Sequence, residues 1–572
     1  LRIRKVVHAY KNLFQSFSEK SFDESGDCNN DIECYSNWDK QSDAVAMVLL
    51  SNGKDLCSGA LLNNTDQNFR PFFLSAFHCI DIGDPDKPGW NDPDEDDKEL
   101  DTYEIAEAEN WAFRFQYKVT ECNGSTVRTT YTYNHAYFRA AWDTTDFALM
   151  ELKNSPLGND EITWLGWDRT GYTPSEGTGI HQPQGDVMKI TFDEDELSET
   201  SYDNEYSGKY YWYNQADNGT YEKGSSGSPL FDQDKRVIGQ LRGGYPGCSS
   251  SKKFWHGAFH RSWTGGGDST SQLSHWLNPN GNSNQTINTL RSPSIYINGD
   301  NPLCSSGDTY TIHDVPTTVK SISWTASPSG LYTNTSTTGS TFSTAWGGSG
   351  SGKGTITATL HNDWGSIDIE KSIWVGKPFI NASEMIFTNT FGDSEYLCTS
   401  HYGNEVSWSY SYPFDYWDVR VSNSNGTQVL YTQRLYYSTS ANLDYTSLSP
   451  GFYLVGVRGT NECGSGAWND TEVMWSDCSQ DGEGGDIYSL ELTPNPVTNE
   501  SEIEVFWNDG KTIEDNIRWE VEVYDLGMNL KSKSNKIYGN KHKIKAHSWE
   551  KGIYIVRAYI GDEIIIKKFM KK

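Results

Sequence analysis

The chain has 572 residues, enough for three to five domains that each bury their own core. Aromatic residues make up 13% of it, with 33 Tyr and 52 Gly, so we expect strands and turns to dominate. The formal net charge of −30 excludes nucleic acid as a partner, because such a surface repels phosphate, and no apolar run approaches the roughly 20 residues that span a bilayer.

The ten cysteines indicate disulfides rather than metal ligands. Six of them precede residue 250 and none follows residue 478. No CxxC pair or HExxH motif is present, which favours an oxidising compartment over metal ligation.

The chain begins at Leu1, without Met, inside a strand-like segment. We interpret residues 1–22 as the end of an upstream pro-segment whose leader and signal peptide are missing. An apolar run at 44–50, a polar turn at 51–54 and a second apolar run at 56–62 then predict a β-hairpin.

The sequence EKGSSGSP at 222–229 is the stretch around which the first half of the chain is organised. Small residues on both sides of a serine let the backbone turn sharply, so that the hydroxyl stands clear. The amides of Gly224 and Ser226 can then point at one spot, as in an oxyanion hole beside a nucleophile. Without other signals, the same cluster is typical of an ordinary turn before a strand.

Two other stretches favour the catalytic interpretation. Residues 71–79 predict a strand that ends on His78, and residues 145–152 predict a strand opened by Asp146. The order His, Asp, Ser is that of chymotrypsin-type triads. Taken singly, each residue is better explained without catalysis, His78 as a packed histidine beside a disulfide and Asp146 as a strand cap.

An acidic loop at 81–101 lies between these two strands, with five carboxylates between residues 92 and 97. Such a run is typical of a solvated loop, and EF-hand spacing is absent. We expect no cofactor and no metal, with Ca²⁺ in this loop as the alternative.

Seven motifs in this order resemble the bacterial lysyl endopeptidase family, a secreted branch of the trypsin-like serine proteases. They are CSGALLNN at 57–64, HC at 78–79, DF at 146–147, LGWDR at 165–169, GSSGSP at 224–229, VIGQL at 237–241 and SWTGG at 262–266. The resemblance covers about residues 23–280 and implies a chymotrypsin-like double β-barrel with the site in the cleft between the barrels.

The resemblance also implies roles for the three motif residues. Ser226 attacks the scissile carbonyl, His78 takes the proton and returns it to the leaving amine, and Asp146 fixes the imidazole tautomer. Three disulfides are implied as well, each contributing about 2–4 kcal/mol: Cys28 with Cys248, Cys34 with Cys122, and Cys57 with Cys79.

Ser225 is the rival nucleophile. Ser226 fits the family pattern better, because Gly224 lies two residues before it and Gly227 follows it. In most trypsin-like enzymes an aspartate precedes the nucleophile and receives the new N-terminus on activation. Ser225 stands there instead, so that ion pair is not available, in keeping with the lysyl branch.

The sequence departs from the family at the base of the specificity pocket. Counting back from the SWT motif at 262–264 puts Phe254 where the lysyl branch has the aspartate that pairs with substrate lysine. Burying an ammonium against Phe254 without a counter-charge is costly, so we do not expect strict lysine preference.

The pocket wall departs as well, because Arg242 replaces the family's histidine and is followed by Gly243 and Gly244. Arg242 favours an acidic or polar residue before the scissile bond, whereas Phe254 favours an apolar one. Alternatively, Arg242 stacks on an aromatic side chain such as Tyr202 or pairs with an internal carboxylate.

From about residue 293 the composition changes, and the sequence predicts short strands of alternating polarity in a stretch rich in Ser, Thr and Gly. Residues 291–377 resemble immunoglobulin-like or polycystic-kidney-disease-like modules, and 378–482 predict a second immunoglobulin- or fibronectin-like β-sandwich. We favour a Cys398–Cys463 disulfide, which leaves Cys304 and Cys478 unassigned. A group of aromatic residues here is interpreted as core and edge, with glycan or protein binding as the alternative: Trp408, Tyr410, Tyr412, Tyr416 and Trp417.

Residues 488–572 contain LELTPNP at 490–496, VEVYDLG at 521–527, GIYIVR at 552–557 and a lysine-rich end. They resemble the C-terminal sorting domain of the type IX secretion system in Bacteroidota, with another small sandwich as the alternative. The resemblance implies the secretion machinery as a partner, export across the outer membrane, and release or surface attachment.

We therefore predict a mainly β chain, with a trypsin-like protease domain at 23–290 followed by three β-sandwich domains. The predicted function is that of a secreted, monomeric serine endopeptidase that cleaves protein or peptide substrates through an acyl-enzyme. The rival hypothesis is a catalytically inactive, protease-like adhesin or substrate-binding surface protein.

Overall fold

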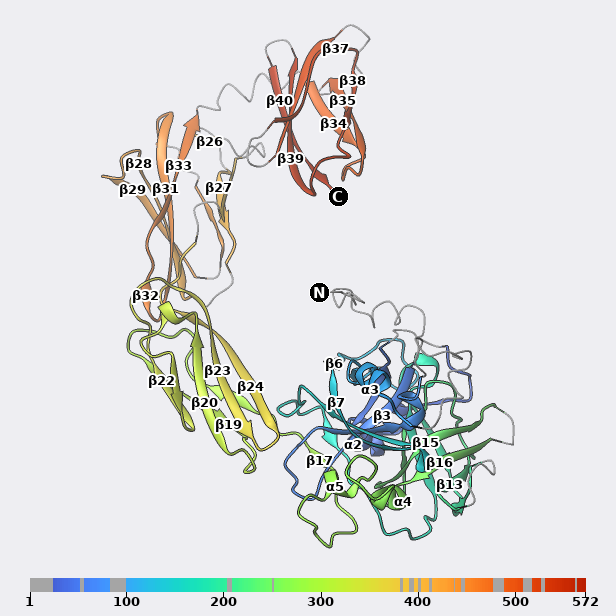
Figure 1. The fold of residues 1–572 in the computed structure, drawn as a ribbon. Helices are drawn as coiled ribbons and strands as arrows, with labels where there is room; N and C mark the ends of the chain where they lie inside the picture. Colours follow the sequence, from blue (N-terminus) through green and yellow to red (C-terminus); the bar gives the residue numbers. More distant parts are fainter. Residues whose placement is uncertain are drawn as a thin grey trace. The chain divides into compact units, whose positions relative to one another are not determined.

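The computed structural model describes residues 24–51, 56–82, 99–202, 208–248, 252–380, 384–389, 396–399, 403–410, 414–436, 438–443, 448–476, 488–507, 517–525, 530–560 and 563–572. The predicted pro-segment, most of the acidic loop, Tyr412 and Cys478 lie outside these residues. The chain divides into two compact units, Leu1–Gly376 and Lys377–Lys572 (Figure 1).

The first barrel of unit 1 is a seven-stranded antiparallel sheet in the order β6-β5-β2-β3-β4-β8-β7. Its strands are β2 (Val45–Leu49), β3 (Leu56–Leu62), β4 (Phe72–Ala76), β5 (Ala112–Phe115), β6 (Tyr131–Asn134), β7 (Ala136–Trp142) and β8 (Phe147–Leu152). The predicted hairpin is confirmed, because β2 pairs with β3 in the register Val45↔Ala60. Phe73 and Phe113 meet edge to face in its interior, with ring centroids 4.8 Å apart.

The second barrel is an eight-stranded sheet in the order β1-β11-β10-β14-β15-β16-β13-β12. Its strands are β1 (Asn30–Asp31), β10 (Gly177–His181), β11 (Lys189–Asp193), β12 (Ser198–Thr200), β13 (Tyr211–Gln215), β14 (Pro229–Phe231), β15 (Val237–Tyr245) and β16 (Lys253–Ala258). One apolar core joins the two barrels, because Leu74 and Leu149 of the first pack in the same cluster as Ile180 and Phe231 of the second.

Short elements and disulfides close the two-barrel domain. Its helices include α2 (Asp39–Ser42), α3 (Thr102–Ala108), α4 (Phe259–Thr264) and α5 (Ser274–Leu277). β9 (Thr163–Trp164) pairs with β17 (Leu290–Arg291) and so ties the end of the domain to its middle. The disulfides join the pairs that the family resemblance implies: Cys28–Cys248, Cys34–Cys122 and Cys57–Cys79.

The rest of unit 1 is a β-sandwich. One sheet holds β18 (Tyr296–Asn298), β19 (Asp308–His313) and β22 (Thr341–Thr344), and the other holds β20 (Ser321–Ser327), β21 (Ser336–Thr338), β23 (Gly352–Asn362) and β24 (Gly365–Val375). Trp324 and Phe342 stack between the sheets. Leu360 and Ile367, near the turn between β23 and β24, belong to the same apolar cluster as Leu157 of the two-barrel domain.

Unit 2 holds a second sandwich and a C-terminal β-domain. The sandwich strands are β25 (Met385–Thr388), β26 (Tyr396–Cys398), β27 (Glu405–Trp408), β28 (Tyr416–Asn423), β29 (Val429–Leu435), β30 (Ser440–Asn442), β31 (Gly451–Asn461), β32 (Gly464–Ser465) and β33 (Asn469–Ser476). The C-terminal strands are β34 (Tyr488–Thr493), β35 (Glu500–Trp507), β36 (Arg518–Asp525), β37 (Leu530–Tyr538), β38 (Lys541–Lys545), β39 (Gly552–Ile560) and β40 (Glu563–Lys571). The predicted mainly β architecture is confirmed.

The aromatic group of the second sandwich divides between core and surface. Trp408 and Trp417 are buried in its core, whereas Tyr410 is exposed and Tyr416 lies under the Arg434 guanidinium. The core interpretation therefore holds for the two tryptophans.

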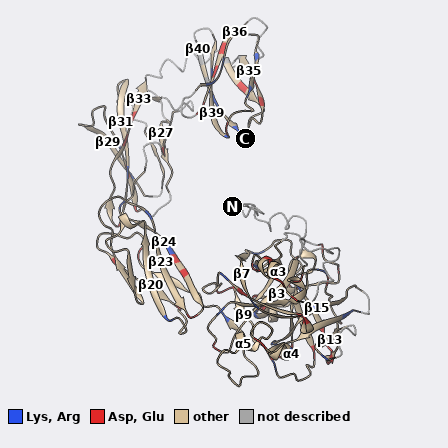
Figure 2. Cartoon of the chain, viewed as in Figure 1, with Lys and Arg blue, Asp and Glu red and all other residues tan. Residues whose placement is uncertain are grey.

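Cys304, Cys398 and Cys463 each form a disulfide, and the predicted Cys398–Cys463 pairing stays a prediction. Acidic and basic residues both occur along the described strands (Figure 2). Among the described residues, no helix has the length and apolar character needed to cross a membrane.

Candidate active site

The end of β4 positions His78. After Ala76 the chain turns through a 3-10 helix, η3 (Phe77–Cys79), and the Cys57–Cys79 disulfide ties that turn to β3. The Phe77 amide also donates to the Asp146 carbonyl at 2.9 Å. The histidine is therefore fixed on a short turn that is secured at both ends.

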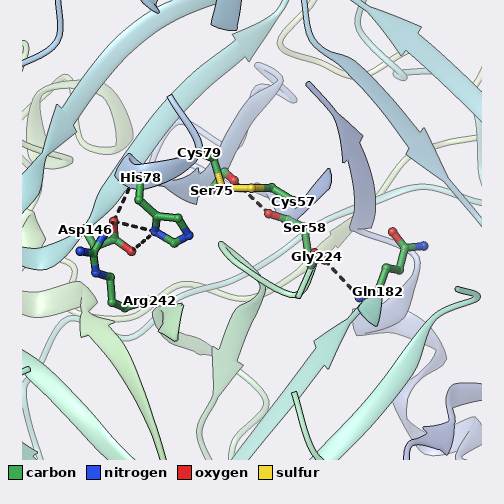
Figure 3. The surroundings of a disulfide bond; sticks show 9 residues. All are labelled: Cys57, Ser58, Ser75, His78, Cys79, Asp146, Gln182, Gly224 and Arg242. Atoms are coloured by element: carbon green, nitrogen blue, oxygen red, sulfur yellow. Dashed lines mark hydrogen bonds and ion pairs between the residues drawn. A yellow bond between two sulfur atoms is a disulfide. The ribbon is translucent and has the colours of Figure 1, made fainter. Parts of the chain in front are cut away.

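Asp146 lies at the junction between η4 (Asp143–Thr145) and β8, in a left-handed conformation with φ +55°. Its carboxylate is fully buried and accepts from the His78 amide at 3.0 Å. The His78 ring contacts the same carboxylate through Nδ1, at 2.9 Å from Oδ2 (Figure 3). Because an ionised carboxylate only accepts, Nδ1 donates, and Nε2 is left as the basic nitrogen.

Arg242 makes a further contact with this carboxylate. Its Nη1 donates to Asp146 Oδ1 at 3.0 Å, and its guanidinium lies over the Tyr202 ring at 5.2 Å. The sequence placed Arg242 in the wall of the specificity pocket, with stacking on Tyr202 or pairing with an internal carboxylate as the alternative. The structure shows both contacts of that alternative.

Two opposing effects set the ionisation of Asp146. Complete burial acts to raise the pKa of its carboxyl, but the charges of His78 and Arg242, with the hydrogen bonds from His78, outweigh burial and hold that pKa below its usual range. Asp146 is therefore an anion at neutral pH.

The loop that carries Ser226 packs against the strand that leads to His78. The Ser226 carbonyl accepts from the Ser58 amide at 2.7 Å. Gly227 has φ +81°, and a Cβ there would lie 2.4 Å from Ser75 Oγ and 2.5 Å from the Ser58 carbonyl oxygen. Only glycine lets the backbone approach β3 and β4 this closely.

The two candidate nucleophiles differ in their surroundings. Ser225 is fully buried, and its hydroxyl bonds His181 Nδ1 at 2.8 Å and accepts from the Glu222 amide at 3.3 Å. Ser226 is only half-buried. These contacts commit the Ser225 hydroxyl to the interior of the second barrel.

Several contacts that secure this loop were not predicted from the sequence. The Glu222 carboxylate accepts from the Gly26 amide at 3.0 Å and from Asn29 Nδ2 at 2.8 Å. Ser58 Oγ donates to the Gly224 carbonyl at 2.9 Å (Figure 3). Partners nearly 200 residues away in the chain cannot be read from a local motif.

The predicted pocket residues lie together on β15 and β16, where Gly244 pairs with Phe254 and Gly243 with Trp255. Phe254 is buried, and its ring meets the Tyr221 ring at 4.7 Å. The side chain predicted to lie at the base of the specificity pocket thus takes part in an aromatic contact, and its role in specificity stays a prediction.

One group of carboxylates could hold a metal ion among the described residues: Asp193, Asp195 and Asp217. Burial raises the pKa of Asp193 to about 6, and the neighbouring Asp217 and Asp195 charges act in the same direction. The acidic loop that the sequence proposed for Ca²⁺ is a different segment and lies mostly outside the described residues.

Two family models match parts of this chain. Residues 22–259 match the model of the lysyl endopeptidase C-terminal domain, and residues 491–572 match that of the secretion system C-terminal sorting domain. The predicted resemblance is therefore confirmed, and the sorting domain indicates export across the outer membrane to a secreted or cell-surface location.

A lysyl endopeptidase from Pseudomonas aeruginosa is 28% identical over 267 residues, which cover 44% of this chain and 51% of that protein. The chain thus spans about half the length of this relative.

Three solved structures are more distant. The Vibrio cholerae VesB protease has a TM-score of 0.26 at 11% identity, covering 58% of this chain and 96% of that one. Deg5 has 0.25 at 12%, covering 40% and 88%, and the FN1–FN3 domains of chicken CNTN1 have 0.22 at 9%, covering 48% and 97%. These TM-scores are too low to establish a shared fold.

Proposed function

We propose that this protein is a secreted serine endopeptidase whose catalytic residues are Ser226, His78 and Asp146. The observation that carries the proposal is the bond between His78 Nδ1 and the buried Asp146 carboxylate, which leaves Nε2 as a base. The packing of the Ser226 loop against β3 and β4 supports it.

In this mechanism Ser226 attacks the scissile carbonyl while His78 Nε2 accepts the hydroxyl proton. The amides of Gly224 and Ser226 receive the oxyanion. His78 returns the proton to the leaving amine, which departs and leaves an acyl-enzyme. Water then attacks the ester with His78 again as the base, and Ser226 is regenerated.

A fluorophosphonate probe tests the proposal, because it phosphonylates an activated serine. The wild-type protein should react, and peptide mapping should place the adduct on Ser226. Ser226→Ala should abolish labelling. Ser228→Ala is the matched control, because its buried hydroxyl has no hydrogen-bond partner within the described residues, and it should still react. Absence of labelling in the wild type would favour the non-catalytic adhesin.

We further propose that cleavage is not strictly lysine-specific. The support is the buried Phe254, which packs on Tyr221 where the family pattern has a carboxylate. Sequencing the cleavage sites of a digested proteome tests this. A profile dominated by lysine on the amino side of the cut would contradict it.

The remaining proposals concern partners and cofactors. We propose that residues 491–572 engage the secretion machinery, that the substrates are proteins or peptides, and that the exported protein acts as a monomer. The mechanism requires no metal or cofactor, so EDTA should leave fluorophosphonate labelling unchanged. Ca²⁺ in the acidic loop would stabilise the fold, and EDTA would then lower the melting temperature.

A further inference from the structure

The Asp146 carboxylate accepts one hydrogen bond that has no role in the proposed mechanism. Two of its hydrogen bonds come from His78, through the amide and through Nδ1. The third comes from Arg242, 96 residues further along the chain, on Oδ1 at 3.0 Å (Figure 3). A charge-assisted bond of this kind is stronger and more directional than a bond from a neutral donor.

The position of Arg242 is fixed from two sides. Arg242 follows Leu241 on β15. The Leu241 carbonyl accepts from the Gly227 amide at 2.8 Å, so the same strand contacts the loop that carries Ser226, here called the nucleophile loop. Its guanidinium lies over the Tyr202 ring. The side chain of Arg242 is only 22% exposed, so solvent screens its charge less than it would at the surface.

We propose that Arg242 is a positioning residue, which holds the Asp146 carboxylate in register with His78 and whose positive charge keeps the His78 ring neutral to lower pH. This inference rests on the proposed function of the site. The anion of Asp146 favours a protonated imidazole, and the nearby guanidinium disfavours it.

Other titratable groups lie on the elements around this pair. Asp143 is in η4, Asp81 follows η3, His256 is on β16, Lys223 is in the nucleophile loop, and Tyr202 is beside Arg242. The charges that act on the Asp146 carboxyl are those of His78 and Arg242. A substitution of Arg242 should therefore change the charge environment of the Asp146 carboxylate and of the His78 ring that bonds to it.

Three substitutions separate charge from hydrogen bonding. Arg242→Lys keeps the charge with a smaller donor group, Arg242→Gln keeps a neutral donor, and Arg242→Met keeps only the stem. We expect the acid limb of the kcat/KM profile to move to higher pH by about 0.5–1 unit in the Gln and Met variants. The Lys variant should keep the wild-type limb. Plateau kcat/KM should fall about tenfold or more with Met and less with Lys, because the carboxylate loses its anchor.

A second measurement does not depend on turnover. In the full chain carrying Ser226→Ala and ¹⁵N-labelled histidine, the midpoint of the His78 ring titration should shift upward with Gln or Met and stay in place with Lys. If Arg242 only supported folding, all three variants would change the melting temperature and the plateau rate. The His78 midpoint would then not separate the neutral Gln and Met variants from the charged Lys variant. A wild-type midpoint in folded Gln and Met variants would overturn the inference. Absence of fluorophosphonate labelling in the wild type would instead overturn only the proposed function.

Discussion

Asp146 combines features that are unfavourable singly. It is fully buried, ionised and left-handed in φ. Asp is one of the residues that tolerate the left-handed region, and three donors from His78 and Arg242 replace the lost hydration. At the residue scale the site therefore depends on one well-satisfied carboxylate.

Substituting this carboxylate should stop the reaction without unfolding the chain. In Asp146→Asn the amide nitrogen cannot accept from His78 Nδ1, so the ring takes the wrong tautomer. We expect kcat/KM to fall by about 10³–10⁴ at neutral pH. Steady-state hydrolysis of a peptide substrate measures it. Asp363→Asn is the control, since that side chain is 70% exposed, and a comparable loss there would contradict the assignment.

Asp232 gives a pH-dependent prediction. Burial raises the pKa of its carboxyl to about 6, although the Arg236 and Asp234 amides act in the opposite direction. A raised pKa stabilises the fold below the unfolded value of about 4, and that contribution is lost as pH rises through 6. Asp232→Asn should therefore gain about 1–2 kcal/mol of stability at pH 7.5, and little at pH 4.

Thermal melts at the two pH values measure this difference. Asp234→Asn in the same turn is the control, because its carboxylate is 62% exposed. An equal effect of Asp232→Asn at both pH values would contradict the buried-charge explanation.

At the scale of elements, the nucleophile loop is held by backbone proximity rather than by its own hydrogen bonds alone. Gly227 touches β3 and β4, and Glu222 takes its partners from the segment that contains Cys28. The Cys28–Cys248 disulfide closes a separation of 220 residues around this arrangement. The loop geometry is thus a property of both barrels.

Gly227→Ala tests this dependence. The new Cβ would overlap Ser75 Oγ and the Ser58 carbonyl, so the loop must move. We expect a cost of about 1–3 kcal/mol and at least a hundredfold slower fluorophosphonate labelling. Gly267→Ala is the matched control, because it also has positive φ but no neighbour within 4 Å of the added Cβ. Equal labelling rates in the two variants would contradict the close-contact argument.

At the scale of the whole molecule, the two-barrel domain and the first sandwich share apolar contacts within unit 1. Leu360 and Ile367 belong to one apolar cluster with Leu157, and Trp364 Nε1 donates to the Asn68 carbonyl at 3.0 Å. We therefore expect the first sandwich to stabilise the first barrel through these contacts.

Two truncated chains should distinguish the stabilising effect of the first sandwich from any effect of unit 2. A chain of residues 24–376 keeps the shared cluster and should melt at the same temperature as the protease transition of the full chain. A chain of residues 24–292 exposes Leu157 and should melt about 5–10 °C lower. Differential scanning calorimetry measures both. Equal melting temperatures for the two truncations would show that the contacts do not stabilise the protease domain.

The sequence by itself determined the features that are local. Strand periodicity predicted the hairpin at 44–62, and short motifs marked His78, Asp146 and Ser226, because a turn of a few residues fixes how each of them is presented. The sorting domain is recognisable for the same reason.

Only the tertiary structure decided what Arg242, Glu222 and Phe254 touch. Arg242 suited a pocket wall as well as an internal ion pair, and Glu222 carried no signal for a contact with Gly26. Phe254 on β16 meets Tyr221, 33 positions earlier and outside any strand, because both side chains pack in one apolar cluster with Leu241 of β15. Such contacts depend on the packing of strands distant in sequence, and a one-residue slip would turn each side chain to the other face of its sheet.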